Sequence, residues 1–156
     1  MSDAVKIITT NRKARHEYHI EERLECGIQL VGTEVKSLRA GKANLQDAFC
    51  TLKSGEMMML NCHISPFKHA SHYNHDPMRP RKLLMHKREI KKWGQALEQK
   101  GYTIIPLSLY FKSGKVKVEI GMARGKKLYD KRSDIAERDS KRRLDRVMKS
   151  QRSDDA

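Results

Sequence analysis

Residues 105–120 read IPLSLYFKSGKVKVEI and carry the clearest structural signal in the chain. Apolar residues fill alternate positions on both sides of residues 112–115, namely Ile105, Leu107, Leu109 and Phe111 before them and Val116, Val118 and Ile120 after them. A period of two predicts β-strands, and the Ser-Gly pair between them predicts a tight turn. The stretch therefore predicts a β-hairpin whose Lys117 points away from the packed face.

Other strand-like runs precede this hairpin at residues 16–21, 24–31, 48–52 and 57–64, separated by glycines and by the Ser54-Gly55 turn. Helices are expected at 34–39, after the potential N-cap Thr33, and at 86–100, where Ile90, Trp93 and Leu97 share one face. Short strands with helices at their ends predict a mainly β fold, a small closed OB-like β-barrel with flanking α-helices.

The 156 residues are strongly basic overall, and their long apolar side chains are distributed unevenly along the chain. The chain has 33 Lys and Arg against 19 Asp and Glu, a formal net charge of +14, which indicates a phosphate-rich partner. Residues 1–122 hold nearly all the long apolar side chains and form the expected barrel. Residues 123–156 contain few, so we expect a basic C-terminal tail that is disordered when free and becomes partly helical against a polyanion.

Cellular location and redox state follow from the same composition. The apolar runs are too short to span a bilayer, so we expect a soluble, cytoplasmic protein without a membrane partner. Three cysteines without CxxC spacing, Cys26, Cys50 and Cys62, are interpreted as reduced packing residues.

Two basic segments suggest contacts with nucleic acid. Residues 11–18, NRKARHEY, place Arg12, Lys13, Arg15, His16 and Tyr18 together. Arginine matches phosphate geometry, and Tyr or His can stack on an unpaired base. The alternative is a basic strand entry with Tyr18 in the core. Residues 79–82 and the lysines of the second helix form another cluster that could follow a nucleic-acid backbone.

The sequence contains no convincing catalytic or metal-binding motif. His69, His72 and His75 invite a zinc hypothesis, but HExxH and paired CxxC motifs are missing, and residues 67–77 favour a mobile solvent loop. GxSxG and phosphate-binding glycine motifs are also missing. We therefore expect a binding protein without metal or cofactor, and not an enzyme.

Four segments together resemble one protein family: residues 11–18, 32–44 (GTEVKSLRAGKAN), 63–66 (HISP) and 123–132 (ARGKKLYDKR). They are similar to the small protein B, or SsrA-binding protein, family of bacteria, and the similarity extends from about residue 11 to 148. The resemblance implies an OB-like barrel that binds the tRNA-like domain of transfer-messenger RNA (tmRNA). It also implies delivery of this RNA to stalled ribosomes for trans-translation.

The resemblance also implies site residues. The family's RNA-binding surface maps onto Glu25, Leu84 and Lys117, although pattern alone favours surface charge for Glu25 and the core for Leu84. With the basic segments, the expected RNA-binding set is Arg12, Lys13, Arg15, His16, Tyr18, Glu25, Leu84, Lys117, Arg124, Lys126 and Lys127. The chain is expected to act as a monomer and to meet elongation factor Tu and alanyl-tRNA synthetase indirectly, through the RNA.

In this family the tail enters the ribosomal decoding site and then the empty mRNA channel. The matching decoding-site residues are Gly125, Tyr129, Asp130, Lys131 and Arg132. The expected channel helix carries Arg138, Lys141, Arg142, Arg143, Arg146 and Lys149. Many relatives have histidine where this chain has Tyr129, which retains a stacking face without the protonation of an imidazole.

Two other functions remain open from the residues alone. Charge and barrel pattern equally favour a general single-strand RNA or ribosome-associated OB-fold protein. A metal-dependent nuclease that uses the histidine segment is a third class.

Overall fold

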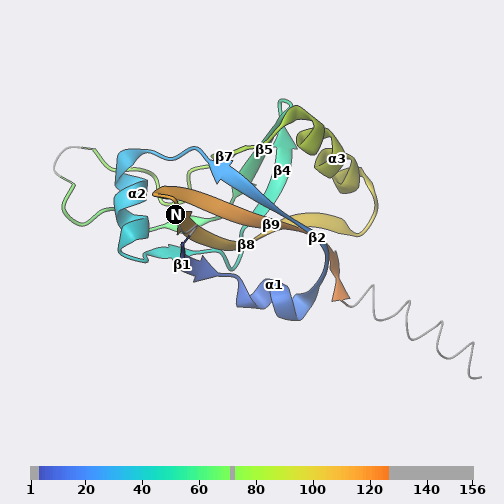
Figure 1. Cartoon of the computed structure of the whole chain (residues 1–156), viewed down its shortest axis with the longest axis horizontal. Coiled ribbons are helices and arrows are strands. Elements are labelled where there is room, and N and C mark those ends of the chain that lie inside the picture. Colours follow the sequence, from blue (N-terminus) through green and yellow to red (C-terminus); the bar gives the residue numbers. More distant parts are fainter. Residues whose placement is uncertain (1–3, 71–72, 127–156) are drawn as a thin grey trace, which may run out of the picture.

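The computed structural model describes residues 4–70 and 73–126 of the chain (Figure 1). The elements in chain order are β1 (Val5–Thr10), α1 (Arg12–Glu17), β2 (Tyr18–Ile28), α2 (Gly32–Arg39), β3 (Ala43–Asn44), β4 (Phe49–Lys53), β5 (Glu56–Leu60), β6 (His63–Ile64), β7 (Arg81–Leu84), α3 (Lys87–Glu98), β8 (Tyr102–Lys112) and β9 (Lys115–Gly125). The mainly β class is confirmed. None of the helices in the described ranges combines the length and apolar character needed to cross a bilayer.

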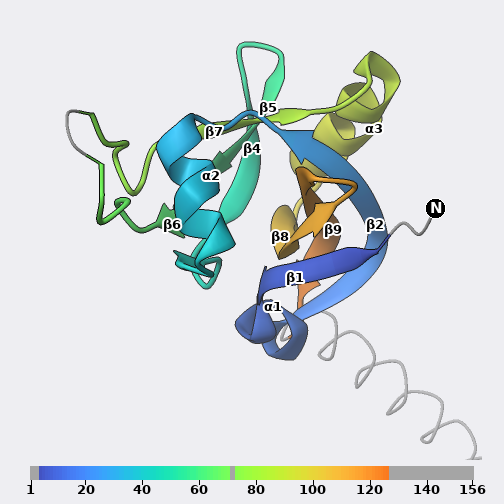
Figure 2. The ribbon, with the colours of Figure 1, turned by 60° about the vertical axis from the view of Figure 1, so that its left-hand side comes forward.

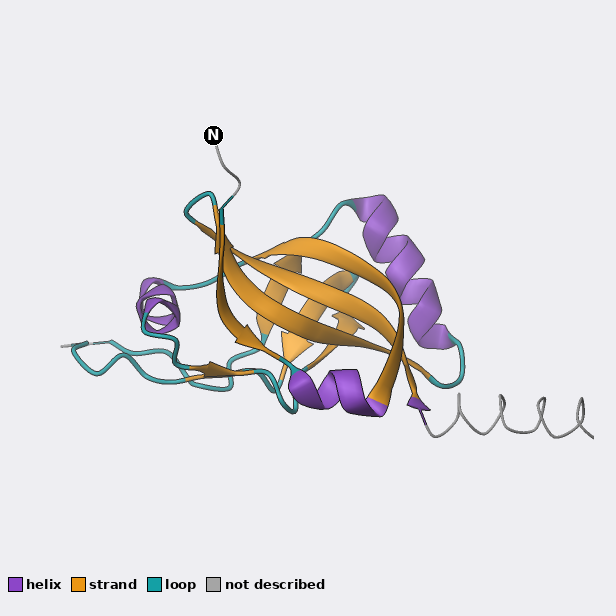
Figure 3. Cartoon of the chain, turned by 60° about the horizontal axis from the view of Figure 1, so that its bottom comes forward, coloured by secondary structure: helices purple, strands orange, loops and turns teal. Residues whose placement is uncertain are grey.

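The main sheet is antiparallel and its strand pairings form a ring. Neighbours follow the order β8-β4-β5-β7-β2-β9, and β9 pairs again with β8. Strand β1 adds to the free edge of the second half of β8. The helices lie around the outside of the strands (Figure 3). The expected OB-like barrel with flanking helices therefore describes the architecture.

The predicted hairpin is present as β8 and β9, and Val116, Val118 and Ile120 of β9 face the main core as predicted, but the single apolar face predicted for β8 is wrong. Between Pro106 and Ser108 the β8–β9 register shifts, so Leu107 is an extra residue in β8. Before this bulge Ile104 faces the main core, and after it Leu109 does. Ile105 and Leu107 belong to a second small cluster with Ala14 of α1 and Ala123 of β9. A β-bulge reverses the alternation, so one strand serves two cores.

Several other boundaries differ from the predictions. The two strands expected at 16–21 and 24–31 are one strand, β2, with Gly27 inside it. Residues 11–17 form α1 and its cap, not a strand entry. The run 57–64 splits into β5 and β6, with Asn61 at a φ of 59° between them. Both longer helices are present, but Val31 rather than Thr33 is the N-cap of α2, and its N–H donates to Glu34 Oε1.

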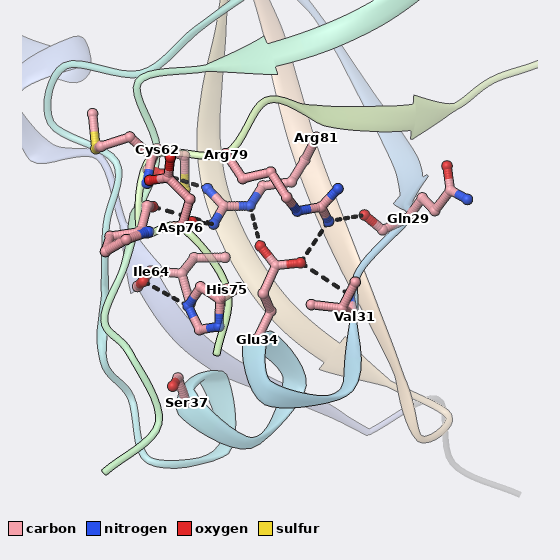
Figure 4. Close-up of polar contacts among 12 residues, drawn as sticks. Gln29, Val31, Glu34, Ser37, Cys62, Ile64, His75, Asp76, Arg79 and Arg81 are labelled. Atoms are coloured by element: carbon pink, nitrogen blue, oxygen red, sulfur yellow. Dashed lines mark hydrogen bonds and ion pairs between the residues drawn. The ribbon is translucent and has the colours of Figure 1, made fainter. Parts of the chain in front are cut away.

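A buried ion pair joins α2 to β7 (Figure 4). The side chains of Glu34 and Arg81 are fully buried, and Arg81 Nε lies 2.5 Å from Glu34 Oε2. Arg79 Nη2 lies 2.6 Å from the other carboxylate oxygen. The rest of the Arg81 guanidinium donates to backbone carbonyls of Cys62 and Pro77. The expectation that residues 79–82 follow a nucleic-acid backbone is therefore wrong for Arg81.

These contacts keep Glu34 ionised. Burial alone would raise the pKa of Glu34, but the hydrogen bonds from Arg79, the Val31 N–H and Arg81 together lower it below its ordinary value of 4.5. The contribution of this carboxylate to stability is therefore complete above the ordinary pKa and is lost as the pH falls through the lowered value.

We predict that Glu34→Gln lowers the free energy of unfolding by about 3 to 5 kcal/mol at neutral pH, because it leaves the Arg81 charge buried without a counter-charge. Urea unfolding measures the difference. The control is Glu22→Gln, which breaks an exposed pair with Lys92 and should cost about 1 kcal/mol or less. The difference in the free energy of unfolding between wild type and Glu34→Gln should become smaller in acid, as the pH falls below the ordinary carboxyl pKa. A Glu34→Gln cost equal to that of the control contradicts the role of the ion pair.

Candidate nucleic-acid interface

A row of directly paired residues crosses four adjacent strands on the outside of the barrel. Leu84 of β7 pairs with Gly27 of β2, Gly27 pairs with Lys117 of β9, and Lys117 pairs with Tyr110 of β8. Directly paired residues on neighbouring strands lie about 5 Å apart and point to the same face. Leu84 and Lys117, which are distant in sequence, therefore lie on one surface, which we call the strand surface.

Glu25 lies two residues before Gly27 on β2 and joins the same face. Tyr110 Oη donates a hydrogen bond of 2.5 Å to Glu25 Oε2, and Lys112 Nζ lies 3.4 Å from both carboxylate oxygens. The bond from Tyr110, with smaller contributions from Lys112 and Lys117, holds the pKa of Glu25 below its ordinary value against the opposing effect of burial. Glu25 is thus a fixed, ionised acceptor beside Lys117.

Leu84 is 52% exposed, so the expectation of a core leucine is wrong. Its side chain extends over Gly27, where an added Cβ would lie 3.2 Å from the Cβ of Leu84. The missing side chain at position 27 lets Leu84 lie close to the sheet. Lys117 is half-buried and alternates with the buried Val118, as the sequence predicted. The strand surface therefore places an apolar group, a cation and a carboxylate side by side.

A second surface, which we call the α1 surface, lies at the other end of β2. Asn11 is buried and fixes α1, because its Oδ1 accepts from the N–H of Ala14 and its Nδ2 donates to the carbonyls of Leu45 and Pro106. Ala14 faces the barrel. The exposed residues of this helix include the predicted set Arg12, Lys13, Arg15 and His16. Tyr18 begins β2, is half-buried and packs against the cluster that includes Ala14.

The end of β9 meets the α1 surface. Gly125 pairs with Tyr18, and His16, Glu17, Tyr18, Gly125 and Lys126 line one hollow. Arg124 is partly engaged within the protein, because its guanidinium lies 4.5 Å from the Tyr102 ring centre and 3.6 Å from Glu21 Oε1. Arg124 is therefore less available to an RNA phosphate than its place in the sequence suggested.

The structure divides the predicted RNA-binding residues into two groups. Glu25, Leu84 and Lys117 come together on the strand surface, and the α1 residues come together with Arg124 and Lys126. The seven steps along β2 from Tyr18 to Glu25 separate the groups by about 23 Å of strand at the usual rise. The remaining predicted residues lie outside the described residues: Lys127, Tyr129, Asp130, Lys131, Arg132, Arg138, Lys141, Arg142, Arg143, Arg146 and Lys149.

The described residues of the histidine segment, 67–70 and 73–77, contain no helix or strand, as expected of a loop, but His75 does not face solvent. His75 is buried, with Nδ1 2.9 Å from Thr33 Oγ1 and Nε2 2.8 Å from the Ile64 carbonyl oxygen. Both ring nitrogens are therefore occupied by bonds within the protein. His72 lies outside the described residues, and among the described ones no three His, Cys, Asp or Glu side chains are grouped to hold a metal ion.

Comparison with known proteins gives concordant matches. The family model described as SmpB protein matches residues 8–150. An SsrA-binding protein of Thermosynechococcus vestitus is 54% identical over 150 residues, covering 96% of this chain and 99% of the relative. One from Desulforamulus reducens is 59% identical over 145 residues, covering 92% and 90%.

One solved structure is also similar to this chain. It is described as "tmRNA-SmpB: a journey to the center of the bacterial ribosome" and matches with a TM-score of 0.65 and 48% identity. The match covers 75% of this chain and 82% of the other.

We predict that Tyr110→Phe raises the pKa of Glu25 toward its ordinary value, because the substitution removes the strongest hydrogen bond to that carboxylate. A ¹³C NMR titration of the Glu25 side-chain carboxyl measures the change. The control is Tyr102→Phe, which removes a hydroxyl that donates to Glu21 and should leave Glu25 unchanged. An unchanged Glu25 titration in Tyr110→Phe contradicts the arrangement.

Proposed function

The chain belongs to the SmpB family, and from this premise we propose that it binds the tRNA-like domain of tmRNA and delivers this RNA to stalled ribosomes for trans-translation. The observation that supports this function best is the convergence of Glu25, Leu84 and Lys117 on one face. The protein acts in the cytoplasm as a binding adaptor and not as an enzyme. Elongation factor Tu and alanyl-tRNA synthetase meet it through the RNA.

The chemistry of the strand surface suits a folded RNA. Lys117 supplies a cation for a phosphate, which positions the RNA without reading its sequence. The ionised Glu25 accepts hydrogen bonds from base N–H groups or from a ribose 2′-hydroxyl. Leu84 offers an exposed apolar side chain against a ribose or the face of a base. Because rigid strands hold all three groups, the surface favours an RNA of fixed shape over a flexible strand.

The α1 surface adds charge about 23 Å away, which is a separation that a structured RNA of tRNA size can bridge. Arg12 and Arg15 lie on an anchored helix and offer planar groups to phosphates. Separate contacts of this kind fix the orientation of a folded RNA.

We assign the ribosomal step to the tail. The family match continues to residue 150, well beyond the described residues. In this proposal Tyr129 to Arg132 enter the decoding site, where the ring of Tyr129 stacks on a base, and Gly125, the last residue of β9, begins the segment that leads there. Arg138 to Lys149 then follow the mRNA channel, where rRNA phosphates neutralise their mutual repulsion. The sequence-based boundary after residue 122 cuts through β9, so the division between RNA capture and ribosome engagement is placed after Lys126.

We predict that Lys117→Ala weakens binding to the tRNA-like RNA and lowers the slope of log K against log salt by about 0.7 to 0.9, the loss of one phosphate contact. The matched control is Lys53→Ala, which removes an exposed lysine at the β4–β5 turn and should change neither value. Binding is measured by filter assay at several salt concentrations, with unchanged thermal unfolding required. Equal affinities and equal salt slopes for the two variants would show that Lys117 does not contact the RNA.

We predict that deleting residues 127–156 preserves most of the affinity for tmRNA but abolishes tagging of stalled chains. The cut lies after Lys126 because β9 continues to Gly125 and Ala123 is buried.

A second variant, Arg142→Pro with Leu144→Pro in the full chain, should retain RNA capture and impair tagging, since each proline costs a helix about 3 kcal/mol. Loss of RNA binding in the folded truncated protein contradicts this division of labour, as does full tagging by the proline variant.

A further inference from the structure

A third basic surface, which the function above does not use, surrounds α2. It consists of α2, the two-stranded β3–β6 sheet and residues 65–70 and 73–78, and we call it the α2 surface. The loop of this surface that follows β6 projects from the barrel beside α2 (Figure 2). Its exposed cations are Lys36, Arg39, Lys42 and Lys68. Glu34 does not offset them, because it is buried and paired with Arg79 and Arg81, which leaves Asp76 as the exposed carboxylate among the described residues of this surface.

Aromatic rings lie among these cations. Tyr73 is 75% exposed, the highest exposure among the large apolar and aromatic side chains that are exposed in the described part of the chain. The rings of Phe67 and His69 contact edge to face with their centres 5.7 Å apart. Lys36 Nζ lies 5.4 Å from the centre of the Phe67 ring. Rings interleaved with cations are the arrangement on which unpaired bases stack while phosphates are neutralised.

The segment that carries these rings is held at several points. The Asn74 side chain both accepts from the N–H of Phe67 and donates to its carbonyl, at 3.1 and 3.0 Å. The buried His75 bonds to Thr33 and to the Ile64 carbonyl. Tyr73 is therefore displayed next to two anchored residues. A framework of this kind lowers the entropy lost when a ring stacks on a ligand.

We propose that the α2 surface binds an unpaired RNA segment, with bases stacked on Tyr73 and Phe67 and phosphates facing Lys36 and its neighbouring cations. This site is separate from the strand surface, which a folded RNA occupies in the proposed function. Helix α2 lies between the two, because Val35 lines a groove with Leu84 and Lys117 while Lys36 contacts Phe67. The protein therefore holds a structured RNA and a single strand at the same time.

The test uses the full chain, first free and then saturated with the tRNA-like RNA domain, titrated with a fluorescent single-stranded RNA octamer and followed by anisotropy. Tyr73→Leu should weaken octamer binding at least about fivefold in both states, the loss expected for one stacked base. Tyr73→Phe keeps the ring and should bind as the wild type does. A 4-thiouridine octamer should crosslink to the α2 surface, mapped by mass spectrometry. Because Tyr73 is exposed, both variants should keep the wild-type thermal unfolding.

Equal octamer affinity of Tyr73→Leu and Tyr73→Phe overturns the proposal, and so do crosslinks confined to the α1 surface or the tail. Impaired ribosome association of Tyr73→Leu with unchanged octamer binding also overturns it, since that result assigns the α2 surface to a protein partner. If the tRNA-like RNA fails to bind, the proposed function fails. The titration of the free chain still tests the α2 surface in that case.

Discussion

The buried pair between Glu34 and Arg81 joins parts of the chain that are far apart in sequence. It ties α2 to β7, and the same guanidinium bonds to backbone carbonyls of Cys62 and Pro77. Strand β7 pairs with two residues of β5 and two residues of β2, and the ion pair adds a side-chain contact to these short ladders. The pair thereby helps to place Leu84 over Gly27 and also supports the segment that carries Tyr73. Both the strand surface and the α2 surface depend on this internal neutralisation.

Net charge gives the kind of partner but not the place where it binds. Two arginines that look like surface cations in the sequence, Arg79 and Arg81, neutralise a buried carboxylate, and Arg124 lies against Tyr102 and Glu21. The exposed cations of the described residues instead lie mainly on α1, around α2 and along α3. The positive potential that attracts RNA therefore comes from specific surfaces. Arginines that neutralise carboxylates within the protein are less available to bind RNA, even where they lie in the most basic segments of the sequence.

The features that the sequence predicted correctly are those that local residue patterns determine. The hairpin, both longer helices and the outward Lys117 follow from periodicity and from glycine signals. The exposure of Leu84 was not predictable from pattern, because it depends on a missing side chain at position 27 of another strand. Burial of Arg81 and His75 depends on partners 47 and 42 residues away in sequence, respectively. Family resemblance supplied Glu25 and Leu84, which physical pattern alone assigned to ordinary surface and core roles.

The bulge at Leu107 connects the fold to the RNA-binding face. If the alternation of 105–111 were unbroken, the side chains of Leu109 and Phe111 would share the face of Ile105 and Leu107, beneath α1. The extra residue reverses the alternation, so Leu109 enters the main core and Tyr110 turns to the opposite face. There Tyr110 pairs with Lys117 and donates to Glu25. One irregularity thus lets β8 support α1 at its first half and orient the carboxylate of the strand surface at its second.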